Sequence, residues 1–213
     1  MAYPIAKHII PLVYSPWIRN VEGLENVPKG KPFIIAANHS SYFDVLLPPV
    51  IIVTKVDKDI HALVNNHYWR PFITRFFLNL WESIPVFLDK EKDSKKRNRE
   101  AFEKAVRYLK NNELVMIFPE GTRSPDGKLK KAYSGVAKLA LVAKIPVLPF
   151  GIIDAHKVLP REKMFPRFKR CEVKIGKLMN FDKYKKTDKK TLEEITRQIM
   201  KEIAKLINQE YNY

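Results

Sequence analysis

The sequence predicts an α/β fold: a single layered domain with a mostly parallel sheet flanked by helices. Short apolar runs that fit buried strands recur along the chain, and stretches with helical spacing of apolar residues separate them. Parallel strands require such crossover segments, so this alternation indicates a largely parallel sheet. The chain has 213 residues and contains neither an internal repeat nor a low-complexity linker, which favours one domain.

Six apolar runs predict strands, because each is short and bounded by turn residues or charges. The run LVMIF at 114–118 is the clearest, and the run at 146–152 is the second clearest. A further run at 172–175 is predicted as an edge strand. The other three predicted strands lie at 33–37, 60–64 and 84–88.

Five segments have helical patterns, and they lie between these strands or after the last one. The helix predicted at 44–53 contains Pro48 and Pro49, which disturb the pattern. Near the end of the chain, Thr191 and Glu194 form the pattern of a capping box, and apolar residues follow on one helix face. The remaining helices are predicted at 67–82, at 133–144, and from a charge-dense connection at 89–99 through Lys110.

The charge balance is strongly basic. The chain has 39 Lys and Arg against 23 Asp and Glu, which gives a net charge of +16. Such a surface favours anionic partners, namely nucleic acid, anionic lipid head groups, or acidic cofactors and carrier proteins. The hydrophobic content of 46% excludes a disordered chain. Cys171 is the only cysteine, so an intramolecular disulfide is excluded and a reducing compartment is favoured.

Two segments are candidates for contact with a membrane surface, although no apolar run is long enough to predict a transmembrane helix. Residues 1–25 are apolar at their start, but Lys7, His8 and several prolines interrupt them, so they fit an interfacial segment better than a signal peptide. The main domain is then expected to span 26–213. The stretch 67–82 combines aromatic residues with arginines, which suits an interfacial helix, but its spacing also fits a helix packed on the sheet.

The first motif that contains candidate catalytic residues is NHSSYFD at 38–44, directly after a predicted strand. His39 and Asp44 come together if the strand ends at the histidine and a helix starts near the aspartate. The carboxylate then holds one imidazole nitrogen and leaves the other as a base. This is the base-and-orienter half of a serine-hydrolase triad, with the hydroxyl supplied by the substrate. A structural histidine beside a capping aspartate is the alternative.

The second motif is FPEGTRS at 118–124, at the carboxyl end of the clearest strand, where open α/β sheets place their ligands. Gly121 allows close approach of the backbone, and Arg123 offers a planar fork suited to phosphate. Thr122 adds a hydroxyl donor, and Glu120 either accepts a hydrogen bond from a ligand hydroxyl or orients the arginine. A charged turn with an ordinary Glu–Arg pair is the alternative.

In this order the motifs resemble those of the glycerolipid acyltransferase superfamily, specifically the 1-acyl-glycerol-3-phosphate (lysophosphatidate) acyltransferases. Three blocks match: NHSSYFD at 38–44, FPEGTRS at 118–124 and IPVLPFGI at 145–152. The second of the family's four blocks falls near 83–90, where Ser83 and Lys90 stand in place of a glycine and an arginine. Lysine lacks the bidentate fork of arginine. The resemblance therefore implies the reaction more firmly than the identity of the acceptor, the molecule whose hydroxyl receives the acyl group.

The resemblance implies a glycerolipid acyltransferase-like fold and transfer of a fatty acyl group from an acyl thioester to the sn-2 hydroxyl of 1-acyl-glycerol-3-phosphate, forming phosphatidate. His39 is then the general base and Asp44 orients it, while Pro149 helps to form the wall of the acyl pocket. The resemblance assigns five residues to the glycerol-phosphate end of the acceptor: Glu120, Gly121, Thr122, Arg123 and Lys90.

No metal and no cofactor are expected beyond the acyl donor, which is acyl-CoA or acyl-carrier protein. The expected partners are this donor, a lysophospholipid acceptor and an anionic membrane surface, with the protein peripheral or monotopic on the cytoplasmic face. Glycerol-3-phosphate or another lysophospholipid is the alternative acceptor. A basic nucleic-acid-binding module explains the charge but not the placed histidine and carboxylates, so no nucleic acid is expected.

Overall fold

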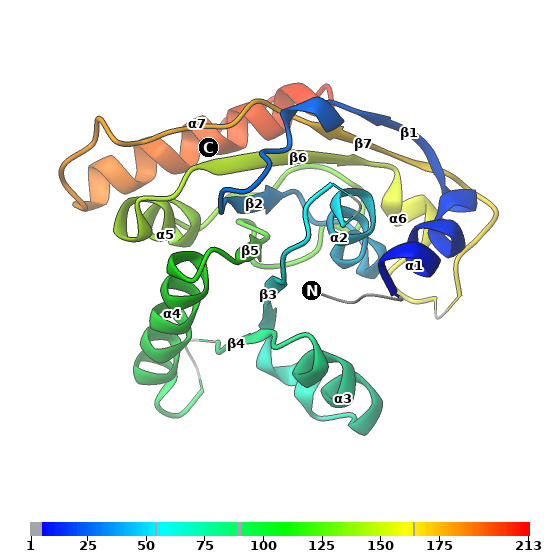
Figure 1. The fold of residues 1–213 in the computed structure, drawn as a ribbon, viewed down its shortest axis with the longest axis horizontal. Coiled ribbons are helices and arrows are strands. Elements are labelled where there is room, and N and C mark those ends of the chain that lie inside the picture. Colours follow the sequence, from blue (N-terminus) through cyan, green and yellow to red (C-terminus); the bar gives the residue numbers. More distant parts are fainter. Residues whose placement is uncertain (1–5, 54, 89–90, 164) are drawn as a thin grey trace.

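The computed structural model describes residues 6–53, 55–88, 91–163 and 165–213. Within these residues, seven strands form one sheet in the order β1-β7-β6-β2-β5-β3-β4 (Figure 1). Neighbouring strands are parallel, except that β6 and β7 are antiparallel, so the predicted mostly parallel α/β fold is confirmed. The strands are β1 (Ile18–Glu22), β2 (Ile34–Ala37), β3 (Ile60–Asn65), β4 (Ile84–Val86), β5 (Leu114–Ile117), β6 (Val147–Ile153) and β7 (Cys171–Ile175).

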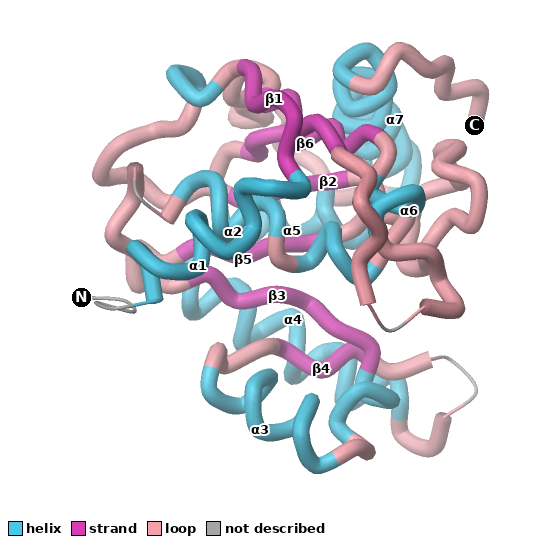
Figure 2. Tube along the Cα trace, turned by 90° about the vertical axis from the view of Figure 1, so that its right-hand side faces the viewer, coloured by secondary structure: helices cyan, strands magenta, loops and turns pink. Residues whose placement is uncertain are grey.

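Helices lie on both faces of this sheet (Figures 1 and 2). The α-helices are α1 (Ala6–Tyr14), α2 (Leu47–Ile52), α3 (Phe72–Leu80), α4 (Ser94–Lys110), α5 (Gly135–Ala143), α6 (Ala155–Val158) and α7 (Lys189–Leu206). The 3₁₀ turns are η1 (Ser15–Trp17), η2 (Leu24–Asn26), η3 (Tyr42–Val45) and η4 (Asn66–Trp69). One face carries α4, α5 and α7, while the other carries α2 and α6, with α1 against α2.

The alternation of side chains along the strands divides the core into two halves. In β2, Ile34 and Ala36 face the half that contains α4, α5 and α7, whereas Ile35 and Ala37 face the half that contains α2 and α6. All four are fully buried. Strands that are covered on both faces need apolar residues at every position. This is why the strands appear in the sequence as continuous apolar runs rather than as alternating patterns.

The six predicted strands all form, but one further strand, β1, was not predicted. It lies in the predicted N-terminal segment of residues 1–25, of which residues 1–5 fall outside the described chain. It pairs in parallel with β7, so the prediction that 172–175 form an edge strand is wrong. In β1 the half-buried Ile18 and Val21 are separated by two exposed polar residues, where the register with β7 shifts, so the strand shows no alternating pattern in the sequence.

The predicted helices form as well, with two differences. The last one begins after Asp188, whose side chain accepts a hydrogen bond from the Thr191 N–H at 2.9 Å, so the capping box predicted for Thr191 and Glu194 is wrong. The stretch 67–82 becomes η4 followed by α3. The large apolar side chains of α3 are exposed to solvent, so the interpretation of this helix as part of the core is wrong.

The C-terminal residues hold the long loop between β5 and α5. Gln209 accepts a hydrogen bond from the Leu129 N–H at 3.0 Å and donates one to the Gly127 carbonyl at 2.9 Å. The hydroxyl of Tyr211 accepts a hydrogen bond from the Ala132 N–H at 3.0 Å. This loop starts with the second motif of the sequence, so the end of α7 and the following residues support its position.

Close packing of α7 on β6 predicts a strong effect of a single methyl group at Gly151. A Cβ there would lie 2.6 Å from the Cβ of Leu206 and 2.8 Å from Cγ2 of Ile207. We expect Gly151→Ala to lower the free energy of unfolding by about 1–3 kcal/mol, because neither the helix nor the central strand can move aside without cost. Urea denaturation followed by circular dichroism measures this change.

Gly135→Ala is the matched control, because a Cβ at Gly135 meets only Cδ1 of Ile117, at an ordinary 3.8 Å. Alanine at the start of α5 is expected to leave stability unchanged or to raise it by up to about 1 kcal/mol. Equal losses in the two variants would contradict the packing argument.

Candidate active site

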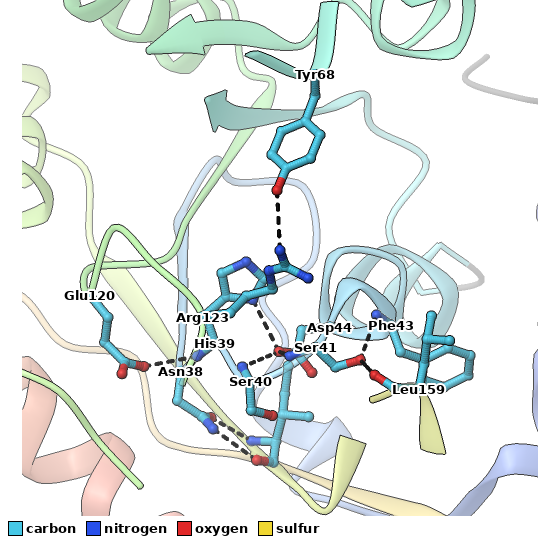
Figure 3. A network of polar contacts seen from close by, with 11 residues as sticks. Asn38, His39, Ser40, Ser41, Phe43, Asp44, Tyr68, Glu120, Arg123 and Leu159 are labelled. Atoms are coloured by element: carbon cyan, nitrogen blue, oxygen red, sulfur yellow. Dashed lines mark hydrogen bonds and ion pairs between the residues drawn. The ribbon is translucent and has the colours of Figure 1, made fainter. Parts of the chain in front are cut away.

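The candidate site lies at the carboxyl ends of β2 and β5, where the loops that follow these strands meet (Figure 3). Asn38 is the first residue after β2, and its side-chain amide forms two hydrogen bonds with the backbone of Ile152 in β6, at 2.8 and 2.7 Å. The carbonyl of His39 accepts a hydrogen bond from the Ser124 N–H at 2.8 Å. The two motifs of the sequence are thus joined through the backbone.

His39 and Asp44 form the expected pair, with 3.0 Å between Nδ1 and Oδ2. The 3₁₀ turn η3 makes this possible, because it turns the chain back within the five residues that separate them. Ser41 caps the turn: its hydroxyl accepts a hydrogen bond from the Phe43 N–H at 3.1 Å and donates one to the Leu159 carbonyl at 2.7 Å. The spacing of the motif therefore has a local structural cause.

The carboxylate of Asp44 has three polar neighbours on one oxygen. Besides His39, the backbone N–H groups of Ser40 and Ser41 donate to Oδ2 at 2.5 and 2.7 Å. The aspartate therefore both caps the turn and contacts the histidine, so the two interpretations of the motif are compatible. With Nδ1 turned toward a carboxylate, the proton of a neutral imidazole is favoured on Nδ1, which leaves Nε2 as an acceptor.

Phe118 holds the other side of the imidazole. The two rings stack with their centroids 4.0 Å apart and 18° between their planes. The side chain of His39 is 15% exposed, whereas that of Asp44 is fully buried. The histidine is thus fixed by a carboxylate and an aromatic ring while part of it remains accessible, as a general base requires.

Glu120 connects the two loops from within. It is 2% exposed, and its two oxygens accept hydrogen bonds from the His39 N–H at 2.8 Å and the Lys130 N–H at 2.9 Å. Burial raises the pKa of Glu120 to about 7, in spite of these two hydrogen bonds. The carboxylate is therefore directed at backbone groups rather than at the guanidinium of Arg123 (Figure 3).

Arg123 is held by two tyrosines instead. Its guanidinium carbon lies 3.5 Å from the centre of the Tyr42 ring, and Nη2 is 3.4 Å from the hydroxyl of Tyr68. The two tyrosine hydroxyls are 3.1 Å apart. Within the described chain, Nη1 is buried without a hydrogen-bond partner, and no carboxylate forms an ion pair with this arginine. A cation with this environment is suited to bind an anion from outside the chain.

The tyrosines are functional candidates that the motif analysis missed. Tyr42 lies inside the first motif, three residues after His39, and its residue type alone gave no sign of a contact with Arg123. Tyr68 lies in η4, 55 residues from Arg123 along the chain, and no local pattern indicates their contact. Burial and the hydrogen bond with Tyr42 raise the pKa of Tyr68, so its hydroxyl stays protonated at neutral pH.

Of the other four residues predicted for the site, three lie in the described part of the chain and one does not. Gly121 has a φ of 66° in the turn after Phe118, a conformation that favours glycine. Thr122 follows it and is exposed. Pro149 is buried in β6 opposite Ala36. Lys90 lies outside the described residues, so its predicted role remains a prediction.

An apolar cavity of about 100 Å³ opens behind the end of β5. Leu63 of β3, Ile117 of β5 and Leu139 of α5 contribute to its lining, whereas Pro149 does not. Sequence reasoning missed this cavity, because its walls come from five separate elements, namely β3, β4, α4, β5 and α5.

A protein-family model described as Acyltransferase matches residues 18–153. The chloroplastic 1-acyl-sn-glycerol-3-phosphate acyltransferase LPAT1 of Arabidopsis thaliana is 25% identical over 149 residues, which are 70% of this chain and 39% of that protein. An enzyme of the same name from Borreliella burgdorferi is 25% identical over 190 residues, 86% of this chain and 70% of that protein. The match thus spans well under half of the Arabidopsis protein.

The fold is also similar to a solved structure, the crystal structure of the 1-acyl-sn-glycerophosphate acyltransferase PlsC from Thermotoga maritima. The TM-score is 0.69, with 98% of this chain and 83% of that chain covered, at 22% sequence identity. At this identity the similarity concerns the arrangement of the elements.

The environment of Glu120 predicts that stability depends on pH. Its pKa is about 7 in the folded chain against 4.5 ordinarily, so the folded state holds this proton more tightly than the unfolded state. The contribution of the protonated group is complete below pH 4.5 and is lost as the pH rises through 7. We expect the free energy of unfolding of the wild type, relative to Glu120→Gln, to fall by about 2–3 kcal/mol over this interval.

Urea denaturation at several pH values measures this difference. Glu103→Gln is the control for replacing a glutamate by glutamine, since Glu103 is exposed in α4. A difference for Glu120→Gln that does not change with pH would contradict the argument.

Proposed function

The chain belongs to the acyltransferase family, and we propose that it transfers a fatty acyl group from an acyl thioester to the sn-2 hydroxyl of 1-acyl-glycerol-3-phosphate, which yields phosphatidate. The relatives that carry the name of this activity support the choice of acceptor. The observation that carries the proposal is the placement of a fixed histidine–carboxylate pair beside an arginine that no carboxylate of the described chain neutralises.

In the proposed reaction, His39 is the general base. Its Nε2 takes the proton of the acceptor hydroxyl as the oxygen attacks the thioester carbonyl, while Asp44 stabilises the imidazolium that forms. The tetrahedral intermediate then collapses, the carbon–sulfur bond breaks, and the proton passes from His39 to the departing thiolate. The products are the new ester and a free thiol, and no enzyme nucleophile takes part.

Arg123 binds the phosphate of the acceptor in this proposal. Stacking on Tyr42 fixes the plane of the guanidinium, and the hydroxyl of Tyr68 adds a donor beside it. Bound in this way, the acceptor has its phosphate at the arginine and its free hydroxyl toward the imidazole. Gly121 and Thr122 follow Glu120 in the same turn, and we assign their exposed backbone and hydroxyl to the glycerol part of the acceptor.

The acyl donor is acyl-CoA or acyl-carrier protein, and no further cofactor is used. Both donors are strongly anionic, which suits a chain with a net charge of +16. No helix in the described part of the chain is long and apolar enough to cross a membrane. We propose that the protein works as a peripheral or monotopic enzyme on the cytoplasmic face of an anionic membrane.

Replacement of the proposed base tests the reaction directly. We expect His39→Ala to lower kcat by about 10²–10⁴-fold, because the acceptor hydroxyl then loses its proton acceptor. The assay measures thiol release and phosphatidate formation with lysophosphatidate and either acyl-CoA or acyl-carrier protein. Activity of the folded variant close to that of the wild type would rule out this role.

His61→Ala is the matched control, because His61 also pairs with a carboxylate, that of Glu113 at 2.6 Å. This pair lies near the start of β3, at the end of the sheet opposite the site. The variant is expected to lose stability but to keep its kcat. If the enzyme acylates only glycerol-3-phosphate or another lysophospholipid, that molecule replaces lysophosphatidate as the proposed acceptor, and the proposed reaction mechanism stands.

The tyrosine beside Arg123 predicts a selective effect on the acceptor. We expect Tyr68→Phe to raise the KM for lysophosphatidate by about 3- to 10-fold, the range for loss of one hydrogen bond, without changing the KM for the donor. Arg123→Lys is expected to raise the acceptor KM further, because lysine cannot stack on Tyr42 or bind phosphate through two nitrogens.

Tyr184→Phe serves as the control, since the hydroxyl of Tyr184 contacts Glu194 and Gln198 of α7, away from the site. Steady-state kinetics with each substrate varied in turn separates the two constants. An increase confined to the donor KM in Tyr68→Phe would assign the tyrosine to the thioester instead.

A further inference from the structure

The helix α3 carries an exposed apolar surface. Five large side chains of this nine-residue helix are at least 44% exposed. Together they form what we call the α3 surface: Phe72, Ile73, Phe76, Phe77 and Leu80. The helix stands beside the edge strand β4, apart from the two layers of helices (Figures 1 and 2). Soluble monomers rarely expose so much contiguous apolar surface without a partner.

The segment that carries this surface is basic, whereas Glu82 and Glu91 lie at its borders. Residues 66–81 contain Arg70 and Arg75 but no Asp or Glu. The guanidinium of Arg75 lies 5.8 Å from the centre of the Phe72 ring, so a cation borders the apolar residues directly. Trp69 and Trp81 lie half-buried at the two ends of the segment. Aromatic residues flanked by arginines are typical of helices that lie in the head-group region of an anionic bilayer.

A second copy of the chain fits this surface less well than a bilayer. A symmetric contact would bring like charges together in a protein whose net charge is already +16. A helix of nine residues is also only about 14 Å long, which offers little of the roughly 800 Å² per partner that stable interfaces bury.

The α3 surface is connected to the site through η4. The hydroxyl of Thr74 in the first turn of α3 donates a hydrogen bond to the Tyr68 carbonyl at 2.6 Å. The side chain of Tyr68 in turn contacts Arg123. The arginine that we propose to bind the acceptor phosphate is therefore one short turn away from a helix suited to lie among lipid head groups.

We propose that the α3 surface docks the protein on an anionic phospholipid bilayer, with its aromatic side chains at the boundary between head groups and acyl chains. Docking there presents the Arg123 site to phosphates at the membrane surface. The use of this orientation for catalysis rests on the proposed function, whereas the docking itself does not.

The test compares the wild-type chain with the double variant Phe72→Gln/Phe76→Gln in flotation with vesicles of phosphatidylcholine, with and without phosphatidylglycerol. We expect the wild type to float with the anionic vesicles and the variant to bind them at least about tenfold more weakly, since two phenyl groups no longer leave water. Val142→Gln, which removes an exposed apolar side chain from α5, is the matched control and is expected to bind as the wild type does. Equal binding by the double variant and the wild type would overturn the proposal.

Two further measurements separate docking from catalysis and from self-association. With a short-chain lysophosphatidate dissolved as monomers, the double variant is expected to keep the wild-type kcat, while it loses turnover of acceptor held in vesicles. If the wild type binds vesicles through α3 but turns over no acceptor, the docking stands and the proposed function fails. A dimer without lipid that the double variant converts to a monomer would assign the surface to a second copy and overturn the proposal.

Discussion

Much of the site depends on one buried carboxylate, that of Asp44. A carboxylate without water is costly unless hydrogen bonds replace its hydration. Here two consecutive backbone N–H groups, of Ser40 and Ser41, supply them to Oδ2, whereas Oδ1 has no partner within the described chain. These groups belong to the residues between the end of β2 and the turn η3. The turn therefore cannot shift without leaving the charge unpaired, and the same interaction that shapes the turn also orients His39.

A second buried carboxylate, Glu120, determines how the two motif loops lie against each other. It accepts a hydrogen bond from each side, and the loop beyond it is held again by Gln209 and Tyr211. Burial raises the pKa of Glu120 to about 7, and the nearby carboxylate of Asp44 contributes to this increase. The region thus gives up some stability at neutral pH to keep two carboxylates in a small volume, as is common where charge is arranged for function.

Two interactions of different range attract the protein surface to an anionic membrane in our proposal, namely electrostatic attraction and apolar contact. The net charge of +16 attracts anionic surfaces over roughly a Debye length, whereas the exposed aromatic residues of α3 act only on contact. The aromatic residues of α3 lie close to the site, because η4 connects α3 to Arg123. Arg123 lies half-buried against two tyrosines rather than beside an acid, so its charge stays available to a ligand.

The sequence by itself determined the fold class, six of the seven strands of the described chain and the His39–Asp44 pair. These follow from local causes: strands buried on both faces need unbroken apolar runs, and a capped turn joins residues five positions apart. Only the tertiary structure decided that β1 borders the sheet, that Tyr68 contacts Arg123, that Glu120 bonds to two backbone N–H groups, and that α3 is exposed. The first three depend on the order of the strands, which brings segments together that are distant in the sequence. The exposure of α3 could not be predicted, because amphipathic spacing is the same for a helix that faces the core and for one that faces outward.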